Sequence, residues 1–323
     1  MKKKTVYIWM GTIVTLTILV FAAIYFLGLQ SEVKKTAKIV DRNGPPVFNF
    51  MINGDLDKSL DKPMDVAKIG SFIYVTDTNH KQIQAFDSSG SPIFQFGKEG
   101  AGKGEFKFPY GIAGDKKGNV YVADLYNGNI SIFDEKGKFI KYFEEQDKKA
   151  KLIHSPAGIR IIDEKLYVTD IKSSKLVVFN LQGKKLLEIA NGANKKDLLN
   201  APNGVTTDKD DNIYVSDSGN NRVVVYDQKG KYLRTVNGSK DGKGSSSFVN
   251  PRGIAVDSRG ILYVVNNLTH FIYGFDESGK EVFTFGGMGD GNEQFYLPNG
   301  LFVDSDDQIY ITDTLNQRVA VYY

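Results

Sequence analysis

The sequence predicts an all-β protein, a six-bladed β-propeller in which six four-stranded sheets form a closed ring. Three observations predict it: a proline-glycine signature recurs every 46 to 49 residues, short β-branched and aromatic runs alternate with Gly, Asp and Asn turns, and the two end segments complete one sheet. Aromatic residues make up 12% of the 323 residues and glycines number 33, as expected for many short strands joined by tight turns.

The recurring signature is Pro-x-Gly followed by an apolar residue. It occurs at 109–112, 156–159, 202–205, 251–254 and 298–301, after a degenerate copy, Pro63-Met64-Asp65-Val66. Successive prolines are 46, 47, 46, 49 and 47 residues apart. A solenoid of this period would need a helix in each repeat, and no helical pattern occurs, so the period favours propeller blades.

Each repeat contains four strand candidates. The first opens at the proline, and the second contains Tyr-Val or Tyr-Ile and, in five copies, ends in an Asp: Asp77, Asp124, Asp170, Asp217 and Asp313. The fifth copy has Asn266 at this place. A third and a fourth run follow, as at 222–227 and 231–236, and the turns between them have hairpin chemistry. Four antiparallel strands of this kind form one blade.

The chain ends complete the ring. The sixth repeat stops after its third strand, at 318–323, and the missing fourth strand is predicted at 46–51, before the first repeat. Pairing of these two segments would leave no open seam. Six blades therefore account for residues 47–323 as one domain.

The N-terminal segment predicts a membrane anchor. Three lysines in residues 1–4 precede an uncharged stretch at 5–29, long enough as a helix to cross a hydrocarbon core of about 30 Å. A cleaved signal peptide, the alternative, has a shorter apolar region and a small-residue cleavage site. We expect a single-pass signal anchor with the N-terminus in the cytoplasm, a basic linker at 30–46 and the propeller outside the cell membrane.

Charge and composition exclude several functions. Residues 1–46 carry a net charge of +5 within a chain total of +3, so the propeller region is −2. This balance argues against nucleic acid as a partner, including the RNA that some regulatory propellers bind. The chain has no cysteine, which excludes disulfides and thiolate chemistry, and only three histidines, His80, His154 and His270.

The repeats resemble the NHL family. The first half of that family's pattern is matched at 251–260, and the second half is matched at 212–223 and at 310–319. The resemblance covers all six repeats and implies the propeller fold. NHL propellers serve many unrelated roles, so the function must be argued from the site.

Two positions in each repeat are expected to face the central channel. One is the residue between Pro and Gly: Met64, Tyr110, Ala157, Asn203, Arg252 and Asn299. The other lies three residues after the Asp or Asn that ends the second strand: His80, Asn127, Ser173, Asn220, Thr269 and Asn316. Residues that the repeat does not require are the better candidates, and exposed Tyr, Phe and Arg are typical of interfaces. The predicted partner-binding residues are Tyr110, Tyr126, Asn203, Arg252, His270, Phe271 and Asn299.

The sequence predicts no catalytic residues, metal or cofactor. The peptide-amidating lyase resembles NHL repeats and holds zinc through histidines at the Pro-x-Gly middle position, where this chain has none. Gluconolactonase-like propellers use a Glu that is also lacking at the aligned inner positions. The clusters at 208–211 and 304–307 lack the Gly and Glu of a calcium loop and are interpreted as hairpin turns.

The stretch at 97–106, GKEGAGKGEF, imitates the start of a phosphate-binding loop. Gly104 stands where that loop needs Ser or Thr, and Pro109 prevents a helix from following. Similar glycine-rich segments at 238–244 and 286–292 also precede a Pro-x-Gly, so we interpret all three as crossovers between blades. Phe106, Phe248 and Phe295 are expected to wedge into the blade interfaces.

These features predict a monomeric, membrane-anchored propeller that binds a protein, peptide or glycan at the cell surface. The alternative is an extracytoplasmic, metal-dependent hydrolase or lyase that uses the channel.

Overall fold

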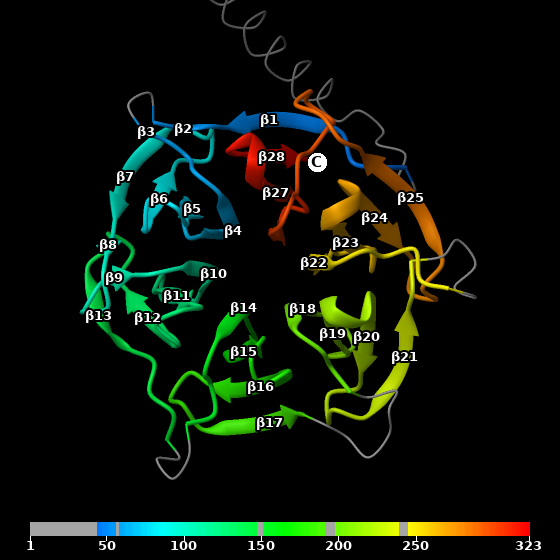
Figure 1. Cartoon of the computed structure of the whole chain (residues 1–323), viewed down its shortest axis with the longest axis horizontal. Helices are drawn as coiled ribbons and strands as arrows, with labels where there is room; N and C mark the ends of the chain where they lie inside the picture. The colour runs from blue at the N-terminus through cyan, green and yellow to red at the C-terminus, as the bar shows by residue number, and fades with distance from the viewer. Residues whose placement is uncertain (1–43, 56–57, 147–150, 191–197, 239–244) are drawn as a thin grey trace, which may run out of the picture. The chain divides into compact units, whose positions relative to one another are not determined.

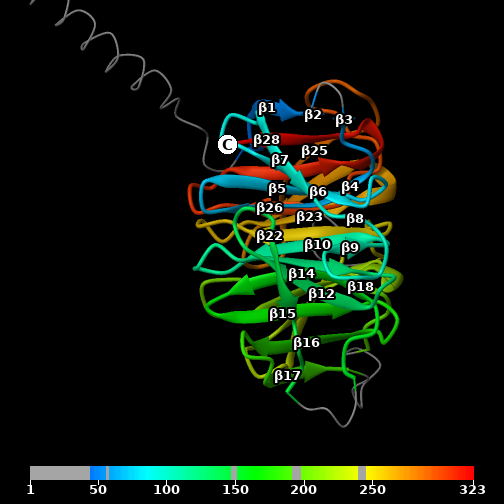
Figure 2. The same ribbon diagram turned by 90° about the vertical axis from the view of Figure 1, so that its left-hand side faces the viewer.

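The computed structural model describes residues 44–55, 58–146, 151–190, 198–238 and 245–323. Their strands form six four-stranded antiparallel sheets arranged as a ring around a central channel (Figure 1). Figure 2 shows the same ring from the side. The six predicted blades are confirmed.

The blades follow one another along the chain. Blade one consists of β4 (Pro63–Ile69), β5 (Phe72–Asp77), β6 (Gln82–Phe86) and β7 (Pro92–Phe96). Blade two consists of β10 (Pro109–Gly114), β11 (Val120–Asp124), β12 (Asn129–Phe133) and β13 (Phe139–Tyr142). Blade three consists of β14 (Pro156–Ile162), β15 (Lys165–Asp170), β16 (Lys175–Asn180) and β17 (Lys185–Ile189). Blade four consists of β18 (Pro202–Thr207), β19 (Ile213–Asp217), β20 (Arg222–Tyr226) and β21 (Tyr232–Val236). Blade five consists of β22 (Pro251–Val256), β23 (Leu262–Asn266), β24 (Phe271–Phe275) and β25 (Glu281–Gly286). Blade six consists of β26 (Leu301–Val303), β27 (Ile309–Asp313), β28 (Arg318–Tyr322) and β1 (Phe48–Ile52). Short 3-10 helices follow the second strands of blades four to six: η1 (Ser218–Asn220), η2 (Asn267–Thr269) and η3 (Thr314–Asn316).

The ring closes as predicted. Strand β1 is the fourth strand of blade six and pairs with β28, so the sheet order is β1-β28-β27-β26. The pairing continues to the C-terminus, because Val47 N donates to Tyr323 O at 2.9 Å and Tyr323 N donates to Val47 O at 3.0 Å. Both segments would be unpaired edges without this closure.

No helix among the described residues has the length and apolar character needed to cross a membrane. The predicted anchor at 5–29 and most of the linker at 30–46 lie outside the described residues.

The glycine of the Pro-x-Gly signature lets neighbouring inner strands approach closely. A Cβ on Gly111 would lie 2.2 Å from Ala157 O, and one on Gly158 would lie 2.1 Å from Asn203 O, in both cases in the next blade. No real Cβ tolerates such a distance to a backbone atom. Thr169 Oγ1 donates to Asn203 O at 2.6 Å across the same interface. The inner strands therefore converge tightly on the channel.

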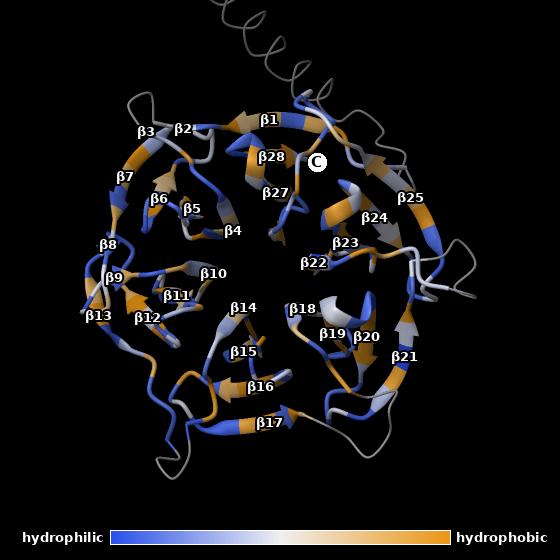
Figure 3. Cartoon of the chain, viewed as in Figure 1, coloured by the Kyte–Doolittle hydropathy of each residue, from blue (hydrophilic) through white to orange (hydrophobic). Residues whose placement is uncertain are grey.

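Apolar side chains fill the spaces between the blades. Phe106, Phe248 and Phe295 are at most 2% exposed, as the wedge prediction requires. The outer strands β17 and β21 contain both polar and apolar residues (Figure 3), and most of their side chains are exposed or only partly buried.

The crossover prediction for 97–106 is also confirmed. Strands β8 (Lys98–Glu99) and β9 (Glu105–Phe106) form a small parallel pair, and the first strand of blade two follows at once. Gly97 has φ +93°, and a Cβ there would lie 2.5 Å from the Phe106 ring. Glycine serves packing here, and a phosphate-binding helix start is absent from this described segment.

The Asp that ends the second strand stabilises loops. Asp217 accepts from Asn200 N at 2.6 Å and pairs with Arg222 Nε at 2.7 Å. Asp313 and Arg318 repeat this ion pair in blade six at 2.8 Å. The carboxylate thus ties the crossover before its blade to the loop that follows its own strand.

The Asp residues of the first hairpin turns are structural as well. Asp208 Oδ1 accepts from the backbone N of Asp210 and of Asn212, each at 2.9 Å, which is a turn-stabilising arrangement. Its other oxygen accepts from the Tyr214 hydroxyl at 3.0 Å. Burial raises the pKa of Tyr74, Tyr167 and Tyr214 to about 12.

We expect the propeller to lose stability at alkaline pH because of these tyrosines. Below about pH 10, the usual tyrosine pKa, the hydroxyls are protonated in both states, and the stabilisation is fully present. As the pH rises from about 10 to about 12, the unfolded chain loses protons that the folded chain retains, so the free energy of unfolding falls. Urea midpoints measured across this range test the expectation, and Tyr214→Phe should flatten the fall; a midpoint that stays constant would contradict it.

Candidate functional site

The two faces of the propeller are formed by different connections between strands. We call the face with the crossovers between blades and the loops between second and third strands the loop face. The opposite face, with the hairpin turns, is the turn face. The first strand of each blade lies next to the channel (Figure 1). It begins at the crossover on the loop face and ends at the first hairpin turn on the turn face.

Tyr110 is the centre of a hydrogen-bond network at the loop-face end of the channel. Its hydroxyl accepts from Asn203 Nδ2 and from Arg252 Nη1, each at 2.7 Å, and donates to Asn299 Oδ1 at 3.2 Å. Asn299 Nδ2 donates to Met64 O at 2.7 Å. Side chains from blades two, four, five and six therefore meet at one phenol, so four of the seven predicted residues lie together.

This network closes the channel. Tyr110, Asn203 and Asn299 are each 3% exposed, so the expectation that Tyr110 is exposed is wrong. The cavity that remains among them holds about 10 Å³, space for one water at most. The cause is the close approach of the inner strands, which brings a phenol from one blade within reach of amides across the channel.

An ion pair spans the channel below Tyr110. The Arg160 guanidinium binds both carboxylate oxygens of Asp65, with Nη1 at 2.8 Å and Nη2 at 3.2 Å. It also donates to Leu301 O at 2.8 Å and to Ile159 O at 2.8 Å. Asp65 Oδ2 accepts from Ile112 N at 3.1 Å. Blades one, two, three and six are joined by this pair, which is bidentate and therefore strongly oriented.

Sequence reasoning did not select Asp65 or Arg160. Asp65 stands where five repeats have the glycine of Pro-x-Gly, and Arg160 stands where the other repeats have Ala67, Ala113, Thr206, Ala255 and Phe302. The sequence feature that could have identified them is that both residues depart from the repeat. The sequence does not show that these two residues form a pair, because they are 95 positions apart and meet only in the folded ring.

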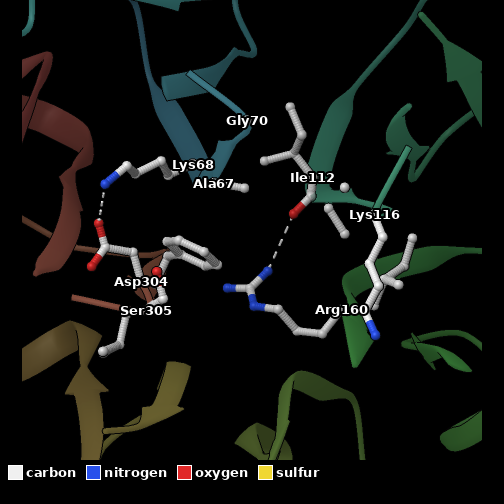
Figure 4. Close-up of a pocket in the computed structure, with 13 residues that line it drawn as sticks. Ala67, Lys68, Gly70, Ile112, Lys116, Arg160, Asp304 and Ser305 are labelled. Carbon is white, nitrogen blue, oxygen red and sulfur yellow. Dashed lines mark hydrogen bonds and ion pairs between the residues drawn. The ribbon is translucent and has the colours of Figure 1, made fainter. Parts of the chain in front are cut away.

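A wider cavity opens on the turn-face side of Arg160. It has a volume of about 470 Å³ and is lined by residues of blades one, two, three and six, including Lys68, Phe302 and Asp304 (Figure 4). Lys68 Nζ pairs with Asp304 at 2.7 Å, and this hydrogen bond raises the pKa of the lysine. The charges of Arg160 and Lys68 are thus balanced by carboxylates of the protein itself.

The other three predicted residues lie on the rim of the loop face. Tyr126 is 67% exposed and stacks at an angle on Phe108, with ring centroids 4.7 Å apart. His270 Nδ1 accepts from Leu297 N at 3.0 Å, and the neighbouring Phe271 is exposed at the start of β24. The predicted set therefore divides into a buried channel group and an exposed rim group.

The second set of predicted channel positions does not face the channel. Asn220 Nδ2 donates to Asp217 at 2.8 Å, and Asn316 Nδ2 donates to Asp313 at 2.7 Å. His80 Nδ1 lies 2.9 Å from Asp77 in the same way. In these three blades the buried carboxylate at the end of the second strand binds the polar side chain, so the expectation was wrong for them.

Among the residues that the structure describes, no group of three or more His, Asp or Glu side chains is placed to hold a metal ion. His80, His154 and His270 lie in separate loops and contact Asp77, Ser173 and Leu297.

Family models match two parts of the chain. Residues 199–226 match the NHL repeat, and residues 257–323 match a six-bladed β-propeller family. Protein lin-41 from Caenorhabditis elegans is 53% identical over 49 residues, which are 15% of this chain and 4% of that protein. The E3 ubiquitin-protein ligase TRIM71 from Rattus norvegicus is 37% identical over 59 residues, 18% of this chain and 7% of that protein. The match thus spans less than a tenth of these relatives.

Solved structures share the fold at low identity. A streptogramin B lyase aligns with a TM-score of 0.56 and 13% identity over 85% of this chain and 96% of its own. A catalytically inactive virginiamycin B lyase from Staphylococcus aureus with quinupristin gives 0.57 and 14% over 83% and 82%. A Bacteroides thetaiotaomicron protein of unknown function gives 0.60 and 17% over 86% and 74%. These likenesses establish the propeller fold.

Tyr110→Phe should destabilise the propeller by about 1–3 kcal/mol, because Arg252 and Asn203 would each lose a buried hydrogen-bond acceptor. Urea unfolding of the variant measures the change. Tyr126→Phe is the matched control in the same blade and should have little effect, since that residue is exposed. Equal effects of the two changes would contradict the role of the network.

Arg160→Ala should cost about 3–5 kcal/mol, because it leaves the buried Asp65 carboxylate without its cation. The double variant Asp65→Gly with Arg160→Ala restores residues found in the other repeats, and we expect it to be more stable than Arg160→Ala alone. Denaturant midpoints of the unchanged protein, the two single variants and the double variant measure the interaction energy of the pair. Losses of stability that add up in the double variant would show that the two residues do not interact.

Proposed function

We propose that this NHL-repeat propeller is a non-enzymatic binding module that is held at the cell membrane by residues 5–29 and presents its loop face to a protein, peptide or glycan outside the cytoplasm. The observation that carries the proposal is the closed channel. The Tyr110 hydroxyl is hydrogen-bonded to Asn203, Arg252 and Asn299, and the cavity left among these side chains is about 10 Å³. Binding by the loop face is then a matter of its surface, which favours a macromolecular partner over a small ligand.

The topology of the propeller supports this orientation. The first described residues lead into the propeller beside the C-terminus, where Val47 pairs with Tyr323 at the turn-face end of β1. The proposed linker at 30–46 is therefore joined to the turn face, and its lysines suit anionic headgroups. An anchor attached at this end would leave the loop face open to a partner.

A second candidate is an extracytoplasmic hydrolase or lyase. The observation that favours it is the likeness of fold to two lyases that act on streptogramin-type compounds, according to their names. The turn-face cavity of about 470 Å³ has room for a small substrate. Metal that copurifies in equimolar amount with the folded chain would favour this candidate.

The absence of cysteine from the chain makes a direct test of the binding proposal possible. Single cysteines at Asn79 and Lys172, on the loop face of blades one and three, would carry a photo-crosslinker on the full chain in its native membrane. A cysteine at Ser89, in a hairpin turn of the turn face, is the matched control. We expect discrete crosslinked protein adducts from the two loop-face positions and none from Ser89. Adducts only from Ser89, or none at all, would contradict the proposal.

A further inference from the structure

Exposed large apolar side chains fall into two main groups in the described part of the chain. One group occupies the second position of the outer strand in blades one to five: Ile93, Ile140, Leu186, Leu233 and Val282; Val47 lies just before the outer strand of blade six. Its members recur with the repeat and so belong to the fold. The second group, which we call the rim patch, lies only in blades five and six and their crossovers: Val249, Leu268, Phe271, Met288, Tyr296 and Leu315.

The rim patch is continuous on the loop face. Backbone hydrogen bonds join Leu268 N to Val249 O at 3.4 Å and Leu315 N to Tyr296 O at 3.0 Å. The Tyr296 and His270 rings are 5.6 Å apart, and Met288 bridges to the residue before Tyr296. A Cβ on Gly287 would lie 3.6 Å from the Phe271 ring, which places Phe271 beside the Met288 segment. Side chains 36% to 64% exposed thus lie together on one surface.

The repeat does not require these side chains. Phe271 occupies the first position of the third strand, where the other blades have Gln82, Asn129, Lys175, Arg222 and Arg318. In blades four and six that position holds the arginine that pairs with the second-strand Asp. Blade five changes both members, since Phe271 lies opposite Asn266 in the strand register. Blade five thus has an amide and an exposed phenyl ring where blades four and six have an ion pair. An exposed phenyl ring does not improve solubility, so its presence here indicates an interaction surface.

The other patch positions show the same departure. Leu268 and Leu315 lie two residues after the end of the second strand, where blades one, three and four have Asn79, Lys172 and Gly219 and blade two has the exposed Tyr126. Val249 and Tyr296 lie two residues before the proline, where the other blades have Asp61, Lys107, His154 and Asn200. Apolar patches that are confined to one sector mark interaction sites, and methionine and aromatic residues are enriched in the centres of interfaces.

The flank of the patch is acidic. Asp290 and Glu293 are exposed in the crossover between Met288 and Tyr296, and neither forms an ion pair with a described residue. Arg318, which donates to Asp290 O, already has its charge paired with Asp313. These carboxylates would repel an anionic lipid surface. A symmetric dimer through the patch would bring the acidic flanks of two copies to one interface, so it is disfavoured too.

We propose that the rim patch docks a segment of a partner protein whose apolar side chains are flanked by Lys or Arg. The inference rests on the proposed function, in which the loop face binds a partner, and specifies the sector and the chemistry of that partner. Apolar side chains of the segment cover Leu268, Phe271 and Leu315, and its basic residues pair with Asp290 and Glu293. Complementary charge fixes the orientation of the segment and speeds its association.

A defined peptide probe tests the proposal on the full-length chain in phosphatidylcholine nanodiscs. The probe is a fluorescein-labelled amphipathic peptide of Leu and Lys, and its two counterparts carry Glu in place of Lys or Ser in place of Leu. Fluorescence anisotropy at physiological salt should show binding of the Leu/Lys peptide alone. Leu268→Asp with Leu315→Asp should weaken it by about tenfold or more. The matched control, Ile93→Asp with Leu233→Asp, changes equally exposed residues of the outer strands and should leave binding unchanged.

Charge reversal completes the test. Asp290→Lys with Glu293→Lys should weaken the Leu/Lys peptide and allow the Leu/Glu peptide to bind. The proposal is overturned if the patch pair and the control pair weaken binding alike, if charge reversal has no effect, or if the patch variants instead lose self-association or binding to anionic vesicles. Crosslinked protein adducts at positions 79 and 172 together with unaffected peptide binding in the rim-patch variants would leave the proposed function intact and refute this inference alone.

Discussion

The convergence of the six inner strands is the constraint on which the rest of the structure depends. Each first strand approaches the next so closely that a Cβ at Gly111, Gly158 or Gly204 would lie 2.1 to 2.5 Å from a carbonyl oxygen of the following blade. Hydroxyls such as those of Thr169 and Ser216 donate across the same interfaces. Because β1 and β28 close the ring, the spacing cannot relax by opening at a seam. A narrow channel is the direct consequence.

Because the channel is narrow, a single residue that departs from the repeat can contact several other blades. At this spacing the Tyr110 phenol reaches partners on three other blades, and the Asp65 carboxylate meets the Arg160 guanidinium. The channel is thereby divided into a closed loop-face end and a cavity that opens on the turn face. Polar residues that would suit a ligand serve instead to hold the blades together. On the loop face, the features that remain available for recognition lie on the rim, where side chains are exposed and the repeat does not dictate them.

The fold could be predicted from the sequence because each blade repeats the same local rules. Prolines at a period near 47 residues, the Asp that ends the second strand and the missing fourth strand of the last repeat each have a local physical meaning. The site was predicted only in part. Tyr110, Asn203, Arg252 and Asn299 were all expected to face the channel, where the structure brings them together, but the burial of Tyr110 depends on distances across the ring that no local pattern encodes. Asp65 with Arg160, and the loop side chains that bind the second-strand Asp, show the same limit, since their partners are chosen by the closed ring.

Hydrogen–deuterium exchange on the full-length chain in its native membrane, compared before and after crosslinking of a partner, tests the central claim most directly. The claim is that the channel is structural and that recognition belongs to the loop face of blades five and six. The account predicts that amides at 267–271, 287–297 and 314–317 exchange more slowly in the crosslinked state, while the hairpin turns at 87–91, 134–138 and 227–231 are unchanged. Slower exchange confined to the turn face or to the walls of the turn-face cavity would contradict it.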